Sequence, residues 1–232
     1  MLGFSTRPGG QSSAPFQGLN MSTSRGDSLQ NVTANRQLFL DQFNTVESQL
    51  AQPVQISQAG IEIVKYPGKY SARDALITDT PGVYLSILTA DCSPILIWSE
   101  AYPLVAAVHS GWQGSELDIL GKTLGLILDS FTVTPASINL VIGPGLGQDN
   151  FEVGAEFSTK FPATYLKEAV NSDRFYFDNN NYLKDTALNF GIPADQIEIL
   201  PYCSYRDSDL FFSHRRDQGV TGRMMSVIGI PT

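Results

Sequence analysis

The chain has 232 residues, of which 42% are hydrophobic, and a formal net charge of −8. This length and composition suffice for a buried core in one large domain or two small ones, and they argue against extensive disorder. The acidic balance disfavours a general nucleic-acid binder, because neutralising phosphates requires a basic face. No apolar run approaches the length of about 18 residues that a membrane span needs, and the start lacks a basic-then-apolar leader. We expect a soluble, cytoplasmic protein with free thiols and a small or neutral ligand.

The first half of the chain predicts a loop-rich segment, a helix and then a sheet. Residues 1–28 are rich in Gly, Ser, Thr and Pro, which is typical of loops. From Ser28 to Val46 the apolar residues follow helical spacing. Short apolar runs separated by Pro-Gly pairs then predict strands at 61–63, 75–77, 83–88, 95–98 and 104–108.

The second half mixes helices and strands. The spacing predicts helices at 117–131, 155–161 and 183–190, and strands at 138–142, 197–200 and 225–230. Several strands are joined by turns too short for a helical crossover. We therefore predict an α+β fold with mixed sheets, in a single domain spanning residues 1–232.

Cys92 and His109 are the most informative residues for function. Each follows an apolar run, and the chain has only two cysteines and two histidines. A thiolate and an imidazole are good zinc or copper ligands, although a catalytic zinc needs about three protein ligands. The same pair can instead act as a nucleophile and its base, with Asp91 as a nearby catalytic carboxylate. A third interpretation is a buried small thiol and a hydrogen-bonded histidine at a strand end.

Two further segments carry polar or glycine-rich patterns. The glycine-rich run at 143–147 follows a predicted strand, but its spacing favours a tight turn over a phosphate loop. The stretch at 202–225 contains four arginines and no lysine, beside several aromatic residues. Guanidinium groups favour bidentate contacts with phosphate or carboxylate, so Arg216 and Arg223 are candidates for an anion clamp. Ion pairs with the aspartates of the same stretch are the alternative.

Several of these segments together resemble the laccase-domain polyphenol oxidase proteins, which are also described as purine nucleoside phosphorylases. The resemblance is carried, in order along the chain, by Thr89-Ala-Asp-Cys-Ser-Pro94, Ala107-Val-His-Ser-Gly-Trp-Gln-Gly114, Ile142-Gly-Pro-Gly-Leu-Gly147 with Phe151-Glu-Val-Gly154, Phe211-Phe-Ser-His-Arg-Arg-Asp217 and Thr221-Gly-Arg-Met224. Gly18-Leu-Asn20 and Asn35-Arg36 extend it to the amino-terminal part. It implies a single α/β/β/α layered domain.

The resemblance also implies phosphorolysis of adenosine, inosine, guanosine and methylthioadenosine, with adenosine deamination, at a zinc or copper site. Purine nucleoside and phosphate are the implied partners, and Asn20 and Arg36 are carried over as substrate-binding residues. The implied metal ligands are one cysteine and two histidines. Cys92 and His109 match two of them.

This sequence departs from the family pattern at the site. Ser57 stands where the first metal-binding histidine is expected. Ser24 replaces another histidine and Gln113 replaces an arginine, whereas His214 stands where a tyrosine is usual. We therefore formulate the hypothesis that His214 replaces the lost ligand. The sequence equally leaves open a metal-free cysteine hydrolase that uses Cys92 and His109, or a non-catalytic relative that binds a nucleoside.

Overall fold

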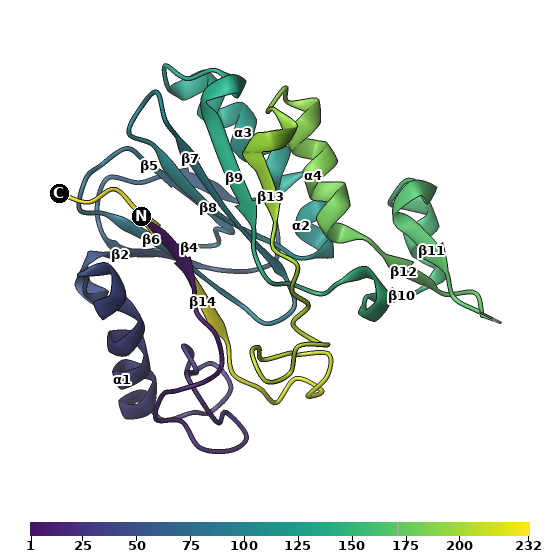
Figure 1. The fold of residues 1–232 in the computed structure, drawn as a ribbon, viewed down its shortest axis with the longest axis horizontal. Coiled ribbons are helices and arrows are strands. Elements are labelled where there is room, and N and C mark those ends of the chain that lie inside the picture. Colours follow the sequence, from purple (N-terminus) through teal and green to yellow (C-terminus); the bar gives the residue numbers. More distant parts are fainter. Residues whose placement is uncertain (171) are drawn as a thin grey trace.

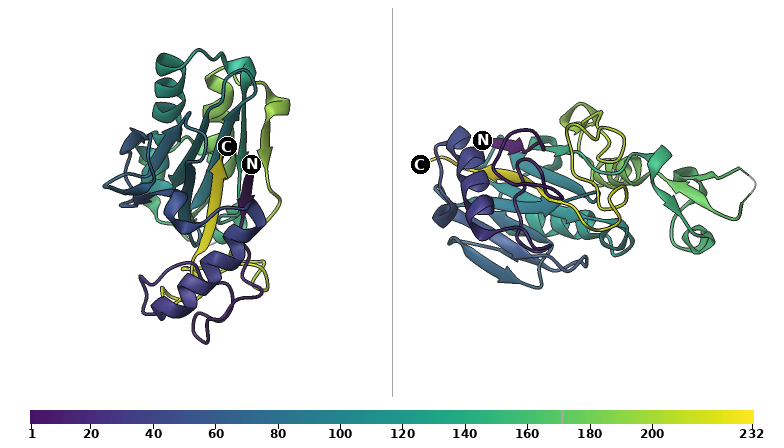
Figure 2. Two further views of the ribbon diagram at one scale, coloured as in Figure 1. Left: turned by 90° about the vertical axis from the view of Figure 1, so that its left-hand side faces the viewer. Right: turned by 90° about the horizontal axis from the view of Figure 1, so that it is seen from below.

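Two β-sheets stacked face to face form the centre of the molecule, and helices cover their outer faces (Figure 1). The computed structural model describes residues 1–170 and 172–232. Figure 2 shows the layers edge-on, with the amino and carboxyl ends close together on one sheet. Among the described residues, no helix is long and apolar enough to cross a membrane.

The larger sheet has six strands. In spatial order they are β13 (Ile197–Ile199), β9 (Ile138–Ile142), β7 (Ser93–Ser99), β8 (Val105–Ser110), β5 (Ala75–Thr78) and β3 (Ile61–Ile63). The strands β7, β8 and β5 pair antiparallel, whereas the two outer pairs are parallel. The second sheet has five strands, in the order β1 (Leu2–Phe4), β14 (Met224–Gly229), β6 (Tyr84–Thr89), β2 (Leu50–Val54) and β4 (Gly68–Ser71).

Alternation of side chains along the central strands creates two apolar layers. On β7, Ile95 and Ile97 face the helices α3 (Ile119–Ser130) and α4 (Asn179–Asn189), and Leu96 faces the other sheet. The short helix α2 (Trp112–Glu116) precedes α3. Helix α1 (Leu29–Leu40) covers the outer face of the five-stranded sheet through Phe39 and Leu40. The predicted α+β fold with α/β/β/α layers is therefore confirmed.

Helix α1 differs from its prediction in length and in its buried face. It begins after Ser28, whose hydroxyl accepts a hydrogen bond from the backbone of Asn31, and the following residues 41–43 form a 3₁₀ turn. Leu29 is 73% exposed although its spacing assigned it to the core face, and Asn35 is fully buried. Asn35 is buried because its amide binds the amino-terminal loop: it accepts from Gln11 N and donates to the carbonyl of Asn20. In this helix, hydrogen bonds to the amino-terminal loop therefore decide which side chains are buried, more than the hydrophobic spacing does.

The helix predicted at 117–131 is α3 (Ile119–Ser130). It begins later than predicted because Asp118 has a positive φ of 55° and its carboxylate caps the helix by accepting the backbone N–H of Gly121. The segment predicted as a helix at 155–161 is a 3₁₀ helix over residues 155–159. It belongs to an arm that extends from the body (Figure 2), built on β10 (Glu152–Val153), β12 (Phe175–Phe177) and β11 (Leu166–Glu168). None of these three strands was predicted. Their apolar side chains form a separate aromatic cluster around Phe177.

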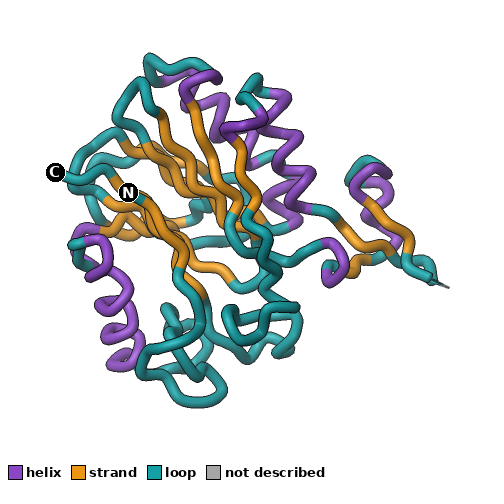
Figure 3. Tube along the Cα trace, viewed as in Figure 1, coloured by secondary structure: helices purple, strands orange, loops and turns teal. Residues whose placement is uncertain are grey.

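Long loops gather at one end of the sheets (Figure 3). The segment from Ser5 to Ser28 has no regular helix or strand, and the stretch between β13 and β14 consists of turns. These loops are ordered by contacts with each other: Arg7 N donates to Leu210 O and Met21 N donates to Arg223 O. Both ends of the chain therefore supply loops to the same end of the molecule.

Candidate functional site

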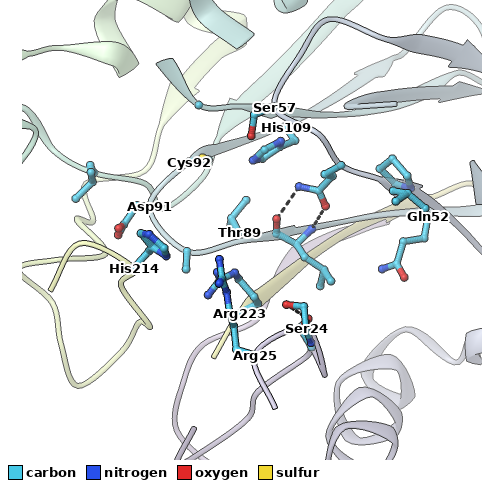
Figure 4. A pocket seen from close by; sticks show the side chains of 18 of the residues that line it. Ser24, Arg25, Gln52, Ser57, Thr89, Asp91, Cys92, His109, His214 and Arg223 are labelled. Atoms are coloured by element: carbon cyan, nitrogen blue, oxygen red, sulfur yellow. Dashed lines mark hydrogen bonds between the residues drawn. The ribbon is translucent and has the colours of Figure 1, made fainter. Parts of the chain in front are cut away.

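A pocket of about 680 Å³ lies where these loops meet the strand ends. Cys92 and His109 line it together with Ser57 from the turn after β2. Figure 4 shows these three side chains along one wall, with Ser24, Arg25 and Arg223 on the opposite wall and His214 beside Asp91 at one end. The structure therefore brings the two predicted reactive residues into one cavity with the arginine-bearing loops.

Asp74 orients the imidazole of His109. Its fully buried carboxylate lies 2.8 Å from His109 Nδ1, and its carbonyl oxygen accepts the backbone N–H of His109. Three backbone N–H groups, of Ile56, Ser57 and Gln58, also donate to this carboxylate. Although burial alone raises the pKa of Asp74, these hydrogen bonds and His109 hold it below its ordinary value. The imidazole is thereby held in place through Nδ1.

Cys92 lies next to the imidazole, in the turn between β6 and β7 (Figure 4). Burial alone lowers the pKa of His109, but the charge of a Cys92 thiolate and the bond to Asp74 raise it to about 9. His109 is therefore protonated at neutral pH when Cys92 is ionised. Gly111 leaves room for the sulfur, since a Cβ at position 111 lies only 2.8 Å from Sγ.

Asp91 borders the same pocket, but its carboxylate is already engaged. One oxygen accepts from the Ser204 hydroxyl and the other accepts from the backbone N–H of Arg215, at 2.7 and 2.6 Å. Its carbonyl accepts the backbone N–H of Leu146, which belongs to the glycine-rich run. The backbone of Asp91 has a φ of 91°, a conformation that most residues avoid. Asp91 therefore joins three segments around Cys92, and its predicted catalytic role stays a prediction.

The donor set does not fit a three-ligand metal centre. Cys92 and His109 supply a thiolate and an imidazole, but Ser57 offers only a hydroxyl, which is a poor zinc ligand at neutral pH. Within residues 1–170 and 172–232, no three His, Cys, Asp or Glu side chains form a group that could hold a metal ion. The hypothesis that His214 is the third ligand therefore gains no support from this arrangement and stays a prediction. The reason is placement: His214 lies in the loop beside Asp91 and Arg223, away from the Ser57 wall (Figure 4).

Arg223 is the predicted clamp residue that reaches the pocket. Its guanidinium donates to the carbonyls of Thr221 and Gly222, and its pKa is lowered by burial and by the nearby Arg25. Among the described residues, no carboxylate is within ion-pair distance of either arginine. Two neighbouring guanidinium groups without a carboxylate are typical of an anion site.

The other predicted binding residues have different positions. Arg36 lines the pocket, where its Nε donates to Met21 O and its guanidinium pairs with Glu47. Asn20 is fully buried and its Oδ1 accepts the backbone N–H of Arg223, so it supports the pocket from behind. The prediction that Arg216 belongs to the anion clamp gains no support, because Arg216 is not among the described residues that line the pocket. Its guanidinium binds Asp217 and three backbone carbonyls, those of Ser204, Tyr205 and Phe211.

Sequence reasoning missed Asp74 and Arg25. Asp74 precedes β5 directly, and nothing in the sequence connects it with His109 on a strand much further along the chain. Arg25 is the one arginine in a run of small polar residues, and this isolated charge was the available signal. Trp112 and Phe151 also line the pocket and give it an aromatic wall. The run at 143–147 is not the tight turn that was predicted. It is an irregular connection in which Gly145 forms a parallel β-bridge with Cys203, and a Cβ at Gly145 would lie 2.9 Å from Ser93 Oγ.

The whole chain matches one protein family. The family model for multi-copper polyphenol oxidoreductase laccase proteins covers residues 1–231. The chain is 33% identical over 232 residues to purine nucleoside phosphorylase YfiH of Escherichia coli (strain K12), covering 97% of this chain and 91% of that protein. It is 34% identical over 230 residues to a purine nucleoside phosphorylase of Deinococcus radiodurans, covering 98% and 88%. The protein belongs to this family of laccase-like polyphenol oxidoreductases, as the motifs indicated.

Solved structures agree with this assignment. YlmD from Geobacillus stearothermophilus superposes with a TM-score of 0.95 at 28% identity, covering 100% of this chain and 92% of that chain. A hypothetical protein YfiH from Bacillus licheniformis gives a TM-score of 0.93 at 30% identity, covering 99% and 92%. The four-layer fold is thus shared along nearly the whole length of both neighbours.

Proposed function

We propose that the chain binds a purine nucleoside and inorganic phosphate and catalyses phosphorolysis to the free base and ribose 1-phosphate. The substrate class is that of adenosine, inosine, guanosine and methylthioadenosine. One observation carries the proposal: a single pocket of about 680 Å³ is lined by the His109 imidazole, the aromatic side chains of Trp112 and Phe151, and the guanidinium groups of Arg25 and Arg223. The relatives named purine nucleoside phosphorylases support the same assignment.

Each wall of the pocket has a part in binding. Trp112 and Phe151 contribute aromatic surface to the pocket lining, against which the purine base packs. Arg223 supplies guanidinium donors for the phosphate, which is a dianion near neutral pH. Holding both reactants in one site converts the encounter of two molecules into a step within one complex.

The bond changes follow from this arrangement. A phosphate oxygen forms a bond to ribose C1′ while the bond from C1′ to purine N9 breaks, and the electron pair of that bond leaves with the base. The base needs a proton, and His109 holds one because its pKa is raised to about 9 by Cys92 and Asp74 against the effect of burial. Asp74 keeps the resulting neutral ring in place through Nδ1.

Zinc or copper, which the family resemblance implies, has no part in this mechanism because the donor set lacks a third ligand. Deamination of adenosine commonly depends on a metal-activated water. We therefore expect adenine and ribose 1-phosphate as products of adenosine, without accumulation of inosine.

The test is an assay of purified protein with adenosine or inosine, in the presence and absence of phosphate. Phosphate-dependent release of base is the expected result, and His109→Gln should reduce it by about 10²- to 10⁴-fold, the usual contribution of a general acid. Tight nucleoside binding without any turnover would instead identify a non-catalytic relative. The Arg206→Ala variant is a matched control, since Arg206 is an exposed arginine paired with Asp207.

A cysteine hydrolase is the second candidate, and the 2.8 Å contact between His109 Nδ1 and Asp74 favours it. In this reaction the Cys92 thiolate bonds to an ester carbonyl carbon, and the alcohol leaves with a proton from His109. Water then hydrolyses the thioester. A Cys92→Ser variant separates the two candidates: loss of ester hydrolysis with retained phosphorolysis supports a nucleophilic thiol, and ester hydrolysis unchanged by the substitution rejects it.

A further inference from the structure

A second cavity adjoins the main pocket. It has a volume of about 540 Å³ and is lined by Ser24, Arg25, His214, Gln218, Gly219 and Val220. Ser24, Arg25 and His214 also line the main pocket, so these three residues form the boundary between the two cavities. A ligand in the main pocket can therefore extend past them into the second cavity.

Arg25 is held at this boundary by a structured turn. The backbone of Gly26 donates to Thr23 O, which closes a turn with Arg25 near its tip. Asn20 supports the turn through its hydrogen bonds to Ser22, and it also donates to the Asp27 carboxylate. Because Asn20 additionally accepts the backbone N–H of Arg223, one buried amide positions both arginine-bearing segments.

The His214 side of the boundary is also held by a structured turn. The backbone of Gly219 has a φ of 88° and its N–H donates to the carbonyl of His214. A Cβ at position 219 lies 3.2 Å from His214 Cε1, so glycine keeps the space beside the imidazole open. Ser24 adds a hydroxyl that already accepts a hydrogen bond from Ser22 and has its own proton to donate.

The main pocket carries more positive charge than a single phosphate ion needs. Arg25, Arg223 and Lys69 all line the main pocket, and none of them has a carboxylate partner among the described residues. Figure 4 shows Arg25 and Arg223 next to each other, and their mutual repulsion contributes to the lowered pKa of Arg223. A second anionic group on the ligand would relieve this repulsion.

We propose that Arg25, His214 and Ser24 form a subsite for the 5′-phosphate of a nucleotide, so that the chain binds nucleoside 5′-monophosphates in preference to nucleosides. The base and ribose occupy the main pocket, the 5′-phosphate lies at the entrance to the second cavity, and Arg223 remains for inorganic phosphate. This inference rests on the proposed function for the placement of the nucleoside.

The experiment compares the binding of adenosine 5′-monophosphate and adenosine by calorimetry in phosphate-free buffer. We expect the nucleotide to bind at least about tenfold more tightly, the effect of one charge-assisted contact. Arg25→Ala should remove that difference between the two affinities, and Arg25→Lys should keep part of it. Arg206→Ala is the matched control, because Arg206 is not among the described residues that line either cavity.

The outcomes distinguish this subsite from the proposed function. Equal affinity for nucleotide and nucleoside in wild type and Arg25→Ala overturns the subsite but leaves phosphorolysis intact. If neither ligand binds, the proposed function itself fails. A repeat titration of the nucleotide in the presence of inorganic phosphate tests whether the 5′-phosphate and the free ion occupy different places. Simultaneous binding of nucleotide and phosphate supports two separate places, and mutual exclusion shows that both anions compete for one place, which overturns the separate subsite.

Discussion

At the scale of single residues, the site is governed by a few side chains with unusual backbone or steric requirements. Asp91 and Ser57 both have positive φ values, of 91° and 57°, and both border the pocket. Strained conformations of this kind persist where surrounding contacts fix them. At Ser57 the contact is the hydrogen bond from its backbone N–H to Asp74, and at Asp91 it is the pair of bonds to its carboxylate.

Ser57→His should create a metal site. Histidine tolerates a positive φ better than most residues, so the turn should accept it. The new imidazole would join Cys92 and His109 as a third donor. We expect the affinity for zinc to rise at least about 10- to 100-fold. Residues that only support a metal ligand contribute this much, and a direct ligand should contribute no less. Metal analysis and competition with a chelator measure this. His214→Ala is the control, and a loss of zinc in that variant would support the hypothesis that His214 is a ligand.

Gly111→Ala should disturb the thiol directly. The added methyl group lies 2.8 Å from Cys92 Sγ, closer than non-bonded atoms approach, so the turn or the sulfur has to move. Overpacking of this kind costs about 1–3 kcal/mol of stability. The rate of Cys92 alkylation reports the displacement of the thiol, and the urea concentration at the midpoint of unfolding reports the loss of stability. Gly125→Ala is the matched control: its nearest neighbour, Phe190, is 3.8 Å away, and alanine in a helix should be neutral or stabilising.

At the scale of elements, strands give the site its frame and loops give it most of its charge. β8 carries His109, and the turn that enters β7 carries Cys92. Asn35 of α1 connects this frame to the amino-terminal loop by binding Ser12, Gly18 and Asn20. A helix that packs on one sheet therefore also positions the turn with Arg25.

Asn35→Ala should loosen the amino-terminal loop. The substitution leaves the N–H of Gln11 and the buried carbonyl of Asn20 without their partner, at a cost of about 1–3 kcal/mol for the buried carbonyl. Limited proteolysis should cut within residues 5–28 faster than in wild type. Thr33→Ala is the control because Thr33 is exposed on the same helix. Equal cleavage in both variants would mean that other contacts hold the loop.

At the scale of the whole molecule, the sequence predicted every strand of the six-stranded sheet, but only β6 and β14 of the five-stranded sheet and only part of the site. The order of the four layers came from the family resemblance. Apolar periodicity identified the strands of the six-stranded sheet because burial on both faces leaves long apolar runs, as in β7 and β8. The three-stranded arm has strands of only two or three residues, too short for a periodic signal. Cys92 and His109 were found because their residue types are rare here, whereas Asp74 is one carboxylate among many and becomes special only through tertiary contacts.

The stability of the fold should depend on pH through His109. Its pKa rises from the ordinary 6.5 to about 9, because Cys92 and Asp74 outweigh the opposing effect of burial. Since the folded value is the higher one, this stabilisation is complete below pH 6.5 and is lost as the pH rises through about 9. Asp74 behaves oppositely: its lowered pKa gives stability that is present above pH 3.8 and lost as the pH falls through its folded value.

Asp74→Asn tests this pH dependence. The neutral amide removes one of the two groups, Asp74 and Cys92, that stabilise the buried imidazolium, so unfolding below pH 6.5 should become easier by about 3–5 kcal/mol. The difference from wild type should shrink near pH 9, where the imidazole loses its proton. Urea denaturation across this range measures both effects. Asp129→Asn is the control, since Asp129 is exposed, and a pH-independent difference for Asp74→Asn would contradict the assignment.

The order of strands in the five-stranded sheet has a consequence for synthesis of the protein. β14 lies between β1 and β6, although β1 is translated first and β14 follows all the other strands. Until residues 224–229 have left the ribosome, the sheet has a gap where its second strand belongs. Arg223, immediately before β14, reaches the pocket at the same moment. The six-stranded sheet can assemble earlier, so the binding site is completed only by the insertion of this late strand.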